Sequence, residues 1–190
     1  KHWSSMTAGL MRSLNINTVG NWSDIGFARE NNLPYVLPLN RFPGTVVQIY
    51  RDFPDVFSDE YRRNSVEFAK QLNDYKDDPY MVGYFLRNEP QWAFGYHNLA
   101  YEMFATGTPS ATREEFVRWI SGKYNNDLKS FNKAWDLELG GFDELKTMVF
   151  KDYPSVRADS DFYAFSEIMV KKYVDVPCDE VAAIDSNHLN

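Results

Sequence analysis

MVGYFL (residues 81–86), followed directly by RNEPQW (residues 87–92), is the stretch that decides the fold. The first six residues carry no charge and include valine, tyrosine and phenylalanine, which indicates a strand buried on both faces, as in a parallel sheet. Charged and polar residues follow it at once. In parallel α/β folds the ligand site lies at the carboxyl ends of the strands. Asn88 and Glu89 are therefore candidates for a functional site at such an end.

Helices and strands alternate in the chain before this stretch. Apolar residues at helical spacing predict helices over 5–14, 25–32 and 61–72. Runs of β-branched and aromatic residues predict strands over 16–22, 35–40 and 81–86, and Pro, Gly and Asp mark 41–58 as a loop. Strands that alternate with helices at this spacing imply βαβ units and a parallel sheet, so the fold class is α/β.

The alternation is interrupted after Pro90. Residues 93–150 predict two or three helices and no strand, so we expect a helical insertion here, with a Thr112/Glu115 capping box starting one helix. A long helix is predicted over 160–185, where Pro177 should kink it or split it in two. No strand is predicted after this helix, and we therefore expect only part of a wound sheet.

Composition argues against several function classes. The net charge of −7 disfavours nucleic acid as a partner, because neutralising phosphates requires clustered Lys and Arg. A nucleotide-binding domain is disfavoured because the chain lacks a Gly-rich phosphate-binding turn. Aromatic residues make up 16% of the chain. They can fill a core, but they also favour a ligand whose faces stack on rings, such as a carbohydrate or a nucleotide.

The sequence predicts no metal, no cofactor and no membrane span. Cys178 is the single cysteine, and the histidines at 2, 97 and 188 lack zinc-site spacing. No apolar run reaches the ~18 residues of a transmembrane helix. The N-terminus lacks a signal-peptide pattern. Localisation stays open: secreted or periplasmic if a signal was trimmed, cytoplasmic otherwise. The oligomeric state is also open.

Four segments, in order, carry a resemblance to a known group of enzymes. GYFLRNEPQW (83–92) resembles the fourth-strand motif of the clan A retaining glycoside hydrolases, and LNINTVGNWSD (14–24) resembles an earlier strand of that clan. The segment 58–90, which includes most of that strand motif, resembles the third helix and the fourth strand of agarase-like and family 42 β-galactosidase-like members. KYNNDLKSFNKAWD (123–136) resembles the stretch after the acid/base, although Asp136 replaces the usual Gly. The tail 182–190 resembles the segment that leads into strand five.

This resemblance implies a TIM (β/α)8 barrel, present here as a partial barrel of roughly its first half. It implies one partial domain over 1–190 with a helical insertion at about 93–150. By resemblance, Glu89 is the acid/base and Asn88 hydrogen-bonds the sugar 2-hydroxyl. Burial beside aromatic walls such as Phe85 and Trp92 would favour the protonated carboxyl that a general acid needs. Alternatively, Glu89 caps the following helix or pairs with Arg87.

The second carboxylate of a retaining glycosidase is not found in this sequence. In the clan the nucleophile comes from strand seven, and this strand lies outside the 190 residues. Glu102, Glu114 and Glu138 lie in helical stretches, where a solvated surface is the better interpretation.

Five further residues are candidates for substrate binding. Asn21 and Trp22 end a predicted strand, but they could also form a helix-entry turn with Trp22 in the core. Arg41 follows the strand 35–40 and could bind sugar hydroxyls or lie on a surface loop. Trp92 could form the floor of a sugar subsite or pack in the core. His97 could contact a subsite, or it could be a structural histidine.

The sequence thus predicts a glycoside hydrolase that cleaves β-glycosidic bonds of galactosides or agar-type polysaccharides with retention. Glu89 would act first as acid and then as base. The alternative is a non-catalytic carbohydrate-binding fragment or module. The expected partner is an oligo- or polysaccharide in either case.

Overall fold

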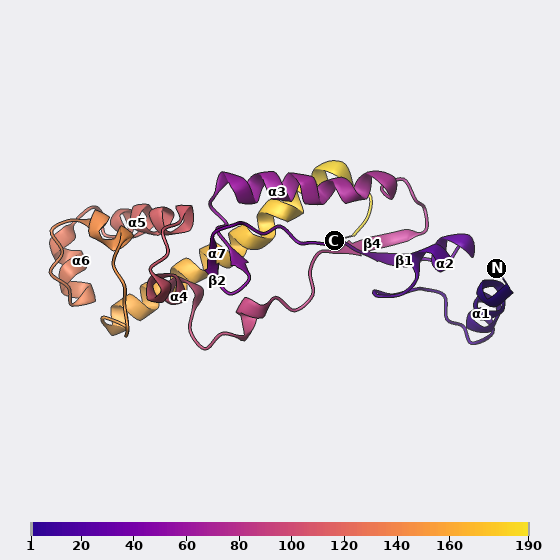
Figure 1. Cartoon of the computed structure of the whole chain (residues 1–190), viewed down its shortest axis with the longest axis horizontal. Helices are drawn as coiled ribbons and strands as arrows, with labels where there is room; N and C mark the ends of the chain where they lie inside the picture. Colours follow the sequence, from indigo (N-terminus) through magenta and orange to yellow (C-terminus); the bar gives the residue numbers. More distant parts are fainter. Residues whose placement is uncertain (1, 190) are drawn as a thin grey trace. The chain divides into compact units, whose positions relative to one another are not determined.

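The computed structural model of the protein describes residues 2–189 and divides into two compact units (Figure 1). The first unit comprises Lys1–Phe42, Val66–Asn88 and Cys178–Asn190, and the second comprises Pro43–Ser65 and Glu89–Pro177. The elements in chain order are α1 (His2–Ser13), α2 (Ile25–Glu30), β1 (Tyr35–Pro38), β2 (Gln48–Tyr50), β3 (Phe53–Pro54), α3 (Asp59–Ala69), η1 (Lys70–Asp74), β4 (Met81–Phe85), η2 (Gln91–Phe94), α4 (Leu99–Thr106), α5 (Ala111–Lys123), α6 (Leu128–Trp135), η3 (Phe142–Lys146) and α7 (Val156–Ile184).

A parallel sheet forms the centre of the first unit. β1 pairs in parallel with β4. Val19 forms a parallel bridge to Tyr35 on the outer side of β1, and Leu189 forms a parallel bridge to Gly83 on the outer side of β4. The order of these four segments across the sheet is therefore their order in the sequence. The α/β class predicted from the sequence is confirmed.

The predicted strand 16–22 is reduced to this single bridge at Val19. The Val19 N–H donates to Pro34 O at 2.8 Å, and Val19 O accepts from the Val36 N–H at 3.1 Å. Val19 is also the only buried residue of that stretch. Alternating side chains predict a strand only when one face has a core to contact, and here a single side chain reaches it.

Apolar side chains of the sheet and of the helices beside it form one core in the first unit. They are Ala8, Val19, Phe27, Ala28, Leu33, Tyr35, Leu37, Leu39, Phe68, Ala69, Leu72, Met81, Tyr84 and Val181. Of the apolar residues on α1, Ala8 is buried, whereas the larger Met6 and Leu10 are exposed. This apolar face of α1 has no cover among residues 2–189.

The helices predicted over 93–150 are present, without a strand among them, and they belong to the second unit. Its core is aromatic: Phe116 packs against Phe104, Trp135, Phe162 and Phe165, with ring centroids 4.9–6.1 Å apart. Trp135 on α6 is fully buried in this core. Much of the aromatic composition is therefore accounted for by this core.

The sequence predicted a loop over 41–58, but the structure has two short strands in this segment. β2 and β3 pair antiparallel across a tight turn at Arg51 and Asp52. Arg51 has a φ of 49°, a left-handed conformation that closes the hairpin. The strands are three and two residues long, too short for their alternation to stand out among prolines and glycines.

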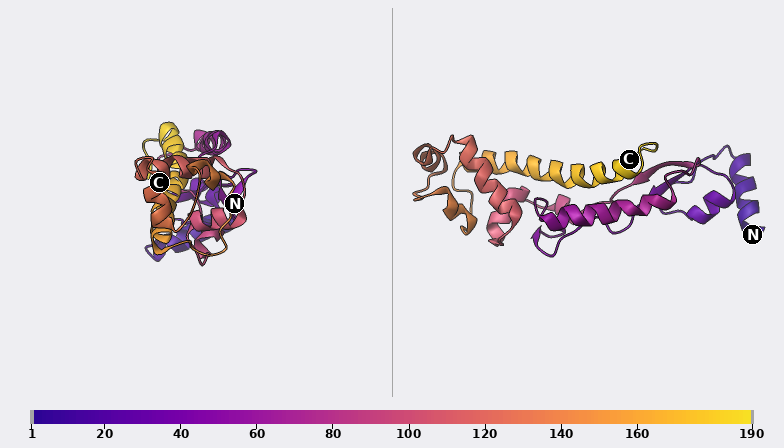
Figure 2. Two further views of the ribbon diagram at one scale, coloured as in Figure 1. Left: turned by 90° about the vertical axis from the view of Figure 1, so that its left-hand side faces the viewer. Right: turned by 90° about the horizontal axis from the view of Figure 1, so that it is seen from above.

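α7 continues past Pro177 as one helix, so the predicted split does not occur (Figure 2). A proline in a helix cannot donate to the carbonyl four residues earlier, which here belongs to Tyr173. The hydroxyl of Tyr61 donates to Tyr173 O at 2.6 Å in a buried position. A side chain 112 residues away thus supplies a donor to the carbonyl that Pro177 cannot reach.

Candidate active site

Polar residues follow each of the neighbouring parallel strands in the first unit. Asn21 and Trp22 follow Val19, Arg41 follows β1, and Asn88 follows β4. Because the strands are parallel, their carboxyl ends meet at one edge of the sheet. The Trp22 ring lies edge-on to Phe85, with ring centroids 6.0 Å apart at 75°. This edge brings together four of the seven predicted site residues.

The polar side chains at this edge differ in exposure. Asn88 and Arg41 are exposed, and so is Trp22, which retains 72% of its accessible surface. Asn21 is half-buried, and its Oδ1 atom is buried without a hydrogen-bond partner among residues 2–189. A buried acceptor without a donor is unfavourable by about 1–3 kcal/mol. A ligand hydroxyl that donates to Asn21 Oδ1 would remove this cost, which makes Asn21 the most favourable position for such a hydrogen bond at this edge.

Three of the predicted residues have left-handed backbones. The φ angles of Trp22, Arg41 and Glu89 are 61°, 55° and 36°. For side chains other than glycine this conformation costs about 1 kcal/mol or more per residue. Strained backbone of this kind is concentrated at functional sites, which makes its occurrence just after successive strands consistent with a site at this edge.

Glu89 directly follows Asn88 in the chain and begins the second segment, Glu89–Pro177, of the second unit. Its side chain is exposed, so the apolar surroundings expected from the sequence are not formed by residues 2–189. Three other glutamates were interpreted from the sequence as solvated surface residues and not as nucleophiles. Glu114 on α5 and Glu138 after α6 are exposed, and Glu102 on α4 is half-buried.

Trp92 has a fixed backbone and a packed ring. The Asp52 carboxylate accepts from the N–H groups of Gln91 and Trp92 at 3.1 and 2.9 Å, and Arg51 donates to Gln91 O at 3.0 Å. The ring lies nearly perpendicular to Phe53 and Tyr173, each with a centroid separation of 5.3 Å. Trp92 is half-buried, so it combines core contacts with an accessible surface.

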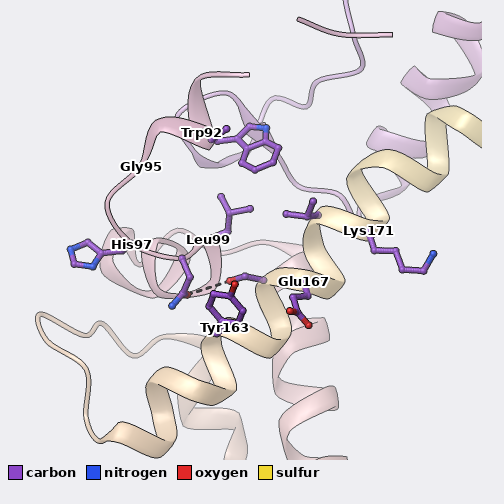
Figure 3. Close-up of a pocket in the computed structure, with 11 residues that line it drawn as sticks. Trp92, Gly95, His97, Leu99, Tyr163, Glu167 and Lys171 are labelled. Atoms are coloured by element: carbon purple, nitrogen blue, oxygen red, sulfur yellow. Dashed lines mark hydrogen bonds between the residues drawn. The ribbon is translucent and has the colours of Figure 1, made fainter. Parts of the chain in front are cut away.

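Trp92 and His97 line one groove of the second unit, with a volume of about 660 Å³ (Figure 3). His97 is exposed, and its ring lies 4.9 Å from Tyr101 and 6.0 Å from Tyr153. Burial, together with the nearby Asp159 carboxylate, raises the pKa of Tyr153 to about 12, so its hydroxyl keeps its proton at neutral pH. The structure thus brings Trp92 and His97 to a common cavity.

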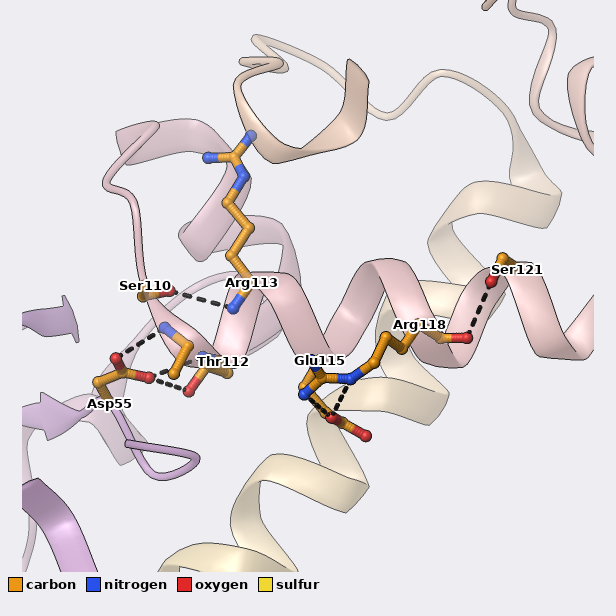
Figure 4. A network of polar contacts seen from close by, with 8 residues as sticks. Asp55, Ser110, Thr112, Arg113, Glu115, Arg118 and Ser121 are labelled. Atoms are coloured by element: carbon orange, nitrogen blue, oxygen red, sulfur yellow. Dashed lines mark hydrogen bonds and ion pairs between the residues drawn. The ribbon is translucent and has the colours of Figure 1, made fainter. Parts of the chain in front are cut away.

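Sequence reasoning missed the buried carboxylate of Asp55. It accepts from the N–H groups of Ala111 and Thr112 at 2.8 and 2.7 Å and from the Thr112 hydroxyl at 2.6 Å (Figure 4). Ser110, and not the predicted Thr112, caps α5, because its hydroxyl accepts from the Arg113 N–H at 3.1 Å. Asp55 therefore fixes the start of α5, a structural role that no local motif announced.

Arg113 is a second buried polar residue in this region. Its Nε atom donates to Leu145 O at 3.0 Å, and its guanidinium lies 4.4 Å from the Phe104 ring centroid. Burial lowers the pKa of Arg113 to about 10. The side chain anchors η3 to α5 through carbonyl groups and pairs with no carboxylate within residues 2–189, so its role is in packing.

Residues 2–189 contain neither a candidate metal site nor a candidate membrane-spanning helix. No three His, Cys, Asp or Glu side chains gather in a way that could hold a metal ion. No helix in this part of the chain is long and apolar enough to cross a membrane.

Known proteins similar to this chain are agar-degrading enzymes. β-Agarase A of Vibrio sp. strain JT0107 is 23% identical over 187 residues, which cover 86% of this chain, and β-agarase B of the same strain is 24% identical over 207 residues. The chain spans about a fifth of the length of these curated relatives, at 19% and 21%. No family model matches the chain.

Solved structures give the same result for the fold. A structure described as an exo-β-agarase superposes with a TM-score of 0.81 at 23% identity, over 99% of this chain and 27% of that one. The crystal structure of an agarase superposes with a TM-score of 0.80 at 21% identity, over 99% of this chain and 28% of the other. The agarase-like resemblance seen in the sequence is thereby confirmed, and the fold is that of a part of these larger proteins.

Proposed function

We propose that the chain is the first part of a TIM (β/α)8 glycoside hydrolase barrel that cleaves β-glycosidic bonds in galactosides or agar-type polysaccharides. The observation that carries this proposal is the position of Asn88-Glu89 after β4, in a parallel sheet whose neighbours follow sequence order. Such an order is what a barrel of successive strand–helix units produces. The agarase relatives, and the uncovered apolar face of α1, agree with a larger protein around this part.

In this proposal Glu89 protonates the leaving oxygen and later activates water, and Asn88 holds the sugar 2-hydroxyl. A retaining mechanism requires a second carboxylate about 5–5.5 Å away as nucleophile. That carboxylate would come from a later strand outside these residues, together with the walls that bury Glu89. Asn21, Trp22, Arg41, Trp92 and His97 would bind other parts of the saccharide.

The test is Glu89→Gln in the full-length enzyme, assayed on two substrate types. Loss of the acid should reduce hydrolysis of natural saccharides by about 10²–10⁴-fold. Aryl glycosides with good leaving groups need little protonation, and their glycosylation step should be affected far less. Glu114→Gln, which alters an exposed carboxylate on α5, is the matched control and should leave both activities unchanged. Equal losses of activity on both substrate types would contradict a role of Glu89 as general acid.

A second candidate function is a non-catalytic carbohydrate-binding module. It is favoured by the exposure of Glu89 within residues 2–189. The two functions differ in turnover by the full-length protein: a binding module would retain saccharide affinity and show no Glu89-dependent hydrolysis.

A further inference from the structure

The groove beside Trp92 has two walls that are far apart in the sequence. One wall is the segment from Trp92 to Leu99, and the other is the face of α7 that carries Tyr163, Glu167 and Val170. Figure 3 shows the Trp92 ring at one end of the groove and Tyr163 towards the other, with Leu99 between them. At about 660 Å³ the groove falls in the range of small-ligand sites, so it can hold more than a single water or ion.

The groove is held in shape before any ligand arrives. Asp52 and Arg51 fix the backbone before and at Trp92 by three hydrogen bonds, as described above. Gly95 lets the loop pass closely by Tyr50, because a Cβ atom at position 95 would lie 3.0 Å from the Tyr50 ring. A preformed wall lowers the entropy cost of binding.

The second wall is anchored by polar contacts between α4 and α7. The Ser166 hydroxyl accepts from the Ala100 N–H at 2.9 Å and donates to Phe162 O at 2.8 Å. Asn98 caps α4 by accepting from the Tyr101 N–H at 2.9 Å. Asn98 and Ser166 are thus occupied by structural bonds, and the groups left to meet a ligand come from Tyr163, Glu167 and His97.

The chemistry of the groove is apolar in the middle and polar at the rim. The Trp92 ring, Leu99 and Val170 supply the apolar surface, while the exposed Tyr163 and Glu167 supply a hydroxyl and a carboxylate. No hydrogen bond or ion pair engages Glu167 within residues 2–189. A pyranose ring has the matching pattern, since its C–H face is apolar and its hydroxyls lie around the edge.

An anionic ligand does not match this pattern. Among residues 2–189, Lys171 is the one lysine that lines the groove. Its side chain extends away from the groove and pairs with Asp175 (Figure 3). Glu167 would repel a phosphate or a carboxylate. A neutral ligand is therefore favoured.

We propose that this groove binds one pyranose ring of a neutral saccharide, with Trp92 as the stacking platform and Glu167 and Tyr163 as hydroxyl partners. The proposal deepens the proposed function and takes its saccharide class from it. Only Pro90 and Gln91 lie between Glu89 and Trp92 in the chain, so the Cα atoms of these two residues are at most about 11 Å apart. A single oligosaccharide could therefore contact both positions.

The test measures binding separately from hydrolysis. Full-length protein carrying Glu89→Gln is titrated calorimetrically with an agar-derived tetrasaccharide, alone and with groove substitutions. Trp92→Ala should weaken binding by about 10-fold, whereas Trp92→Phe, which keeps a stacking ring, should stay within a few-fold of the parent. Glu167→Gln and Tyr163→Ala alter exposed side chains that the fold does not require. Each substitution should weaken saccharide binding by a few-fold.

Glu114→Gln on α5 is the control and should bind as the parent does. Unchanged affinity in the Glu167 and Tyr163 variants, or an equal loss in Trp92→Phe and Trp92→Ala, would overturn the proposal. Failure of the proposed function has a different signature: saccharide binding would still depend on the groove, while the parent protein without Glu89→Gln would show no Glu89-dependent hydrolysis.

Discussion

The continuity of α7 past Pro177 leads to a prediction about Tyr61. Its hydroxyl donates to Tyr173 O, the carbonyl that Pro177 leaves without its helical donor. Tyr61→Phe removes this one donor and keeps the ring, which is stacked on Tyr173 with a centroid separation of 6.5 Å. Tyr61 is fully buried, so water cannot replace the hydroxyl. The free energy of unfolding should fall by about 2 kcal/mol, the cost of leaving a buried carbonyl without this bond.

A double-mutant cycle with Pro177→Ala separates this explanation from a simple loss of packing. Alanine at 177 restores an N–H group that can donate to Tyr173 O within the helix. Tyr61→Phe should then cost less than about 0.5 kcal/mol, which gives a coupling energy of about 1.5 kcal/mol. Urea denaturation followed by tryptophan fluorescence measures all four proteins. The same loss from Tyr61→Phe in both backgrounds would refute the reasoning.

Two other predictions concern buried carboxylates. Asp55→Ala leaves the N–H groups of Ala111 and Thr112 without their acceptor and should lower the free energy of unfolding by about 3–5 kcal/mol, against about 1 kcal/mol for the control Ser110→Ala at the same helix end; urea midpoints that shift equally would contradict this. Burial raises the pKa of Asp185, but hydrogen bonds from Asn187 and His188 outweigh it and hold the pKa below its ordinary value of 3.8. The ionised Asp185 carboxylate therefore stabilises the fold above about pH 4, and this stabilisation is lost as the pH falls through the folded-state pKa. Asp185→Asn should lower the free energy of unfolding at pH 6 and make it depend less on pH in that acid range.

The parts of the fold that could be predicted are those whose signals are local. β1 and β4 are short apolar runs between turn residues, and the inserted helices carry their own periodicity. The continuity of α7 at Pro177 could not be predicted in the same way. The compensating donor is the hydroxyl of Tyr61 on α3, which lies 112 residues before Tyr173 in the sequence. The predicted strand over 16–22 was wrong for the opposite reason: its β-branched residues are a good local signal, but within residues 2–189 only Val19 of this stretch finds a partner strand and a core.

The candidate site residues also divide into those with a local sequence signal and those without one. Asn88 and Glu89 could be proposed as site residues from the sequence because a motif, a strand end and a family resemblance coincide within a few residues. Tyr163 and Glu167 could not, because helical periodicity marks them only as exposed positions on α7, and nothing local connects them with Trp92. Aromatic composition was a weak guide to function, since Phe116, Trp135 and their neighbours are used for the core of the inserted helices.

The surroundings of Glu89, more than its position, decide between a hydrolase and a binding module. Either protein could present Asn88 and Glu89 at the end of a parallel strand. A general acid must also keep its proton at the working pH, which requires removal from water or a neighbouring negative charge. Glu89 is exposed within residues 2–189, so both would have to come from other parts of the full-length protein. A nucleophilic carboxylate about 5 Å away would supply the charge, and a substrate bound across this edge would exclude the water. If Glu89→Gln then impairs only substrates with poor leaving groups, the surroundings are complete and the edge is catalytic.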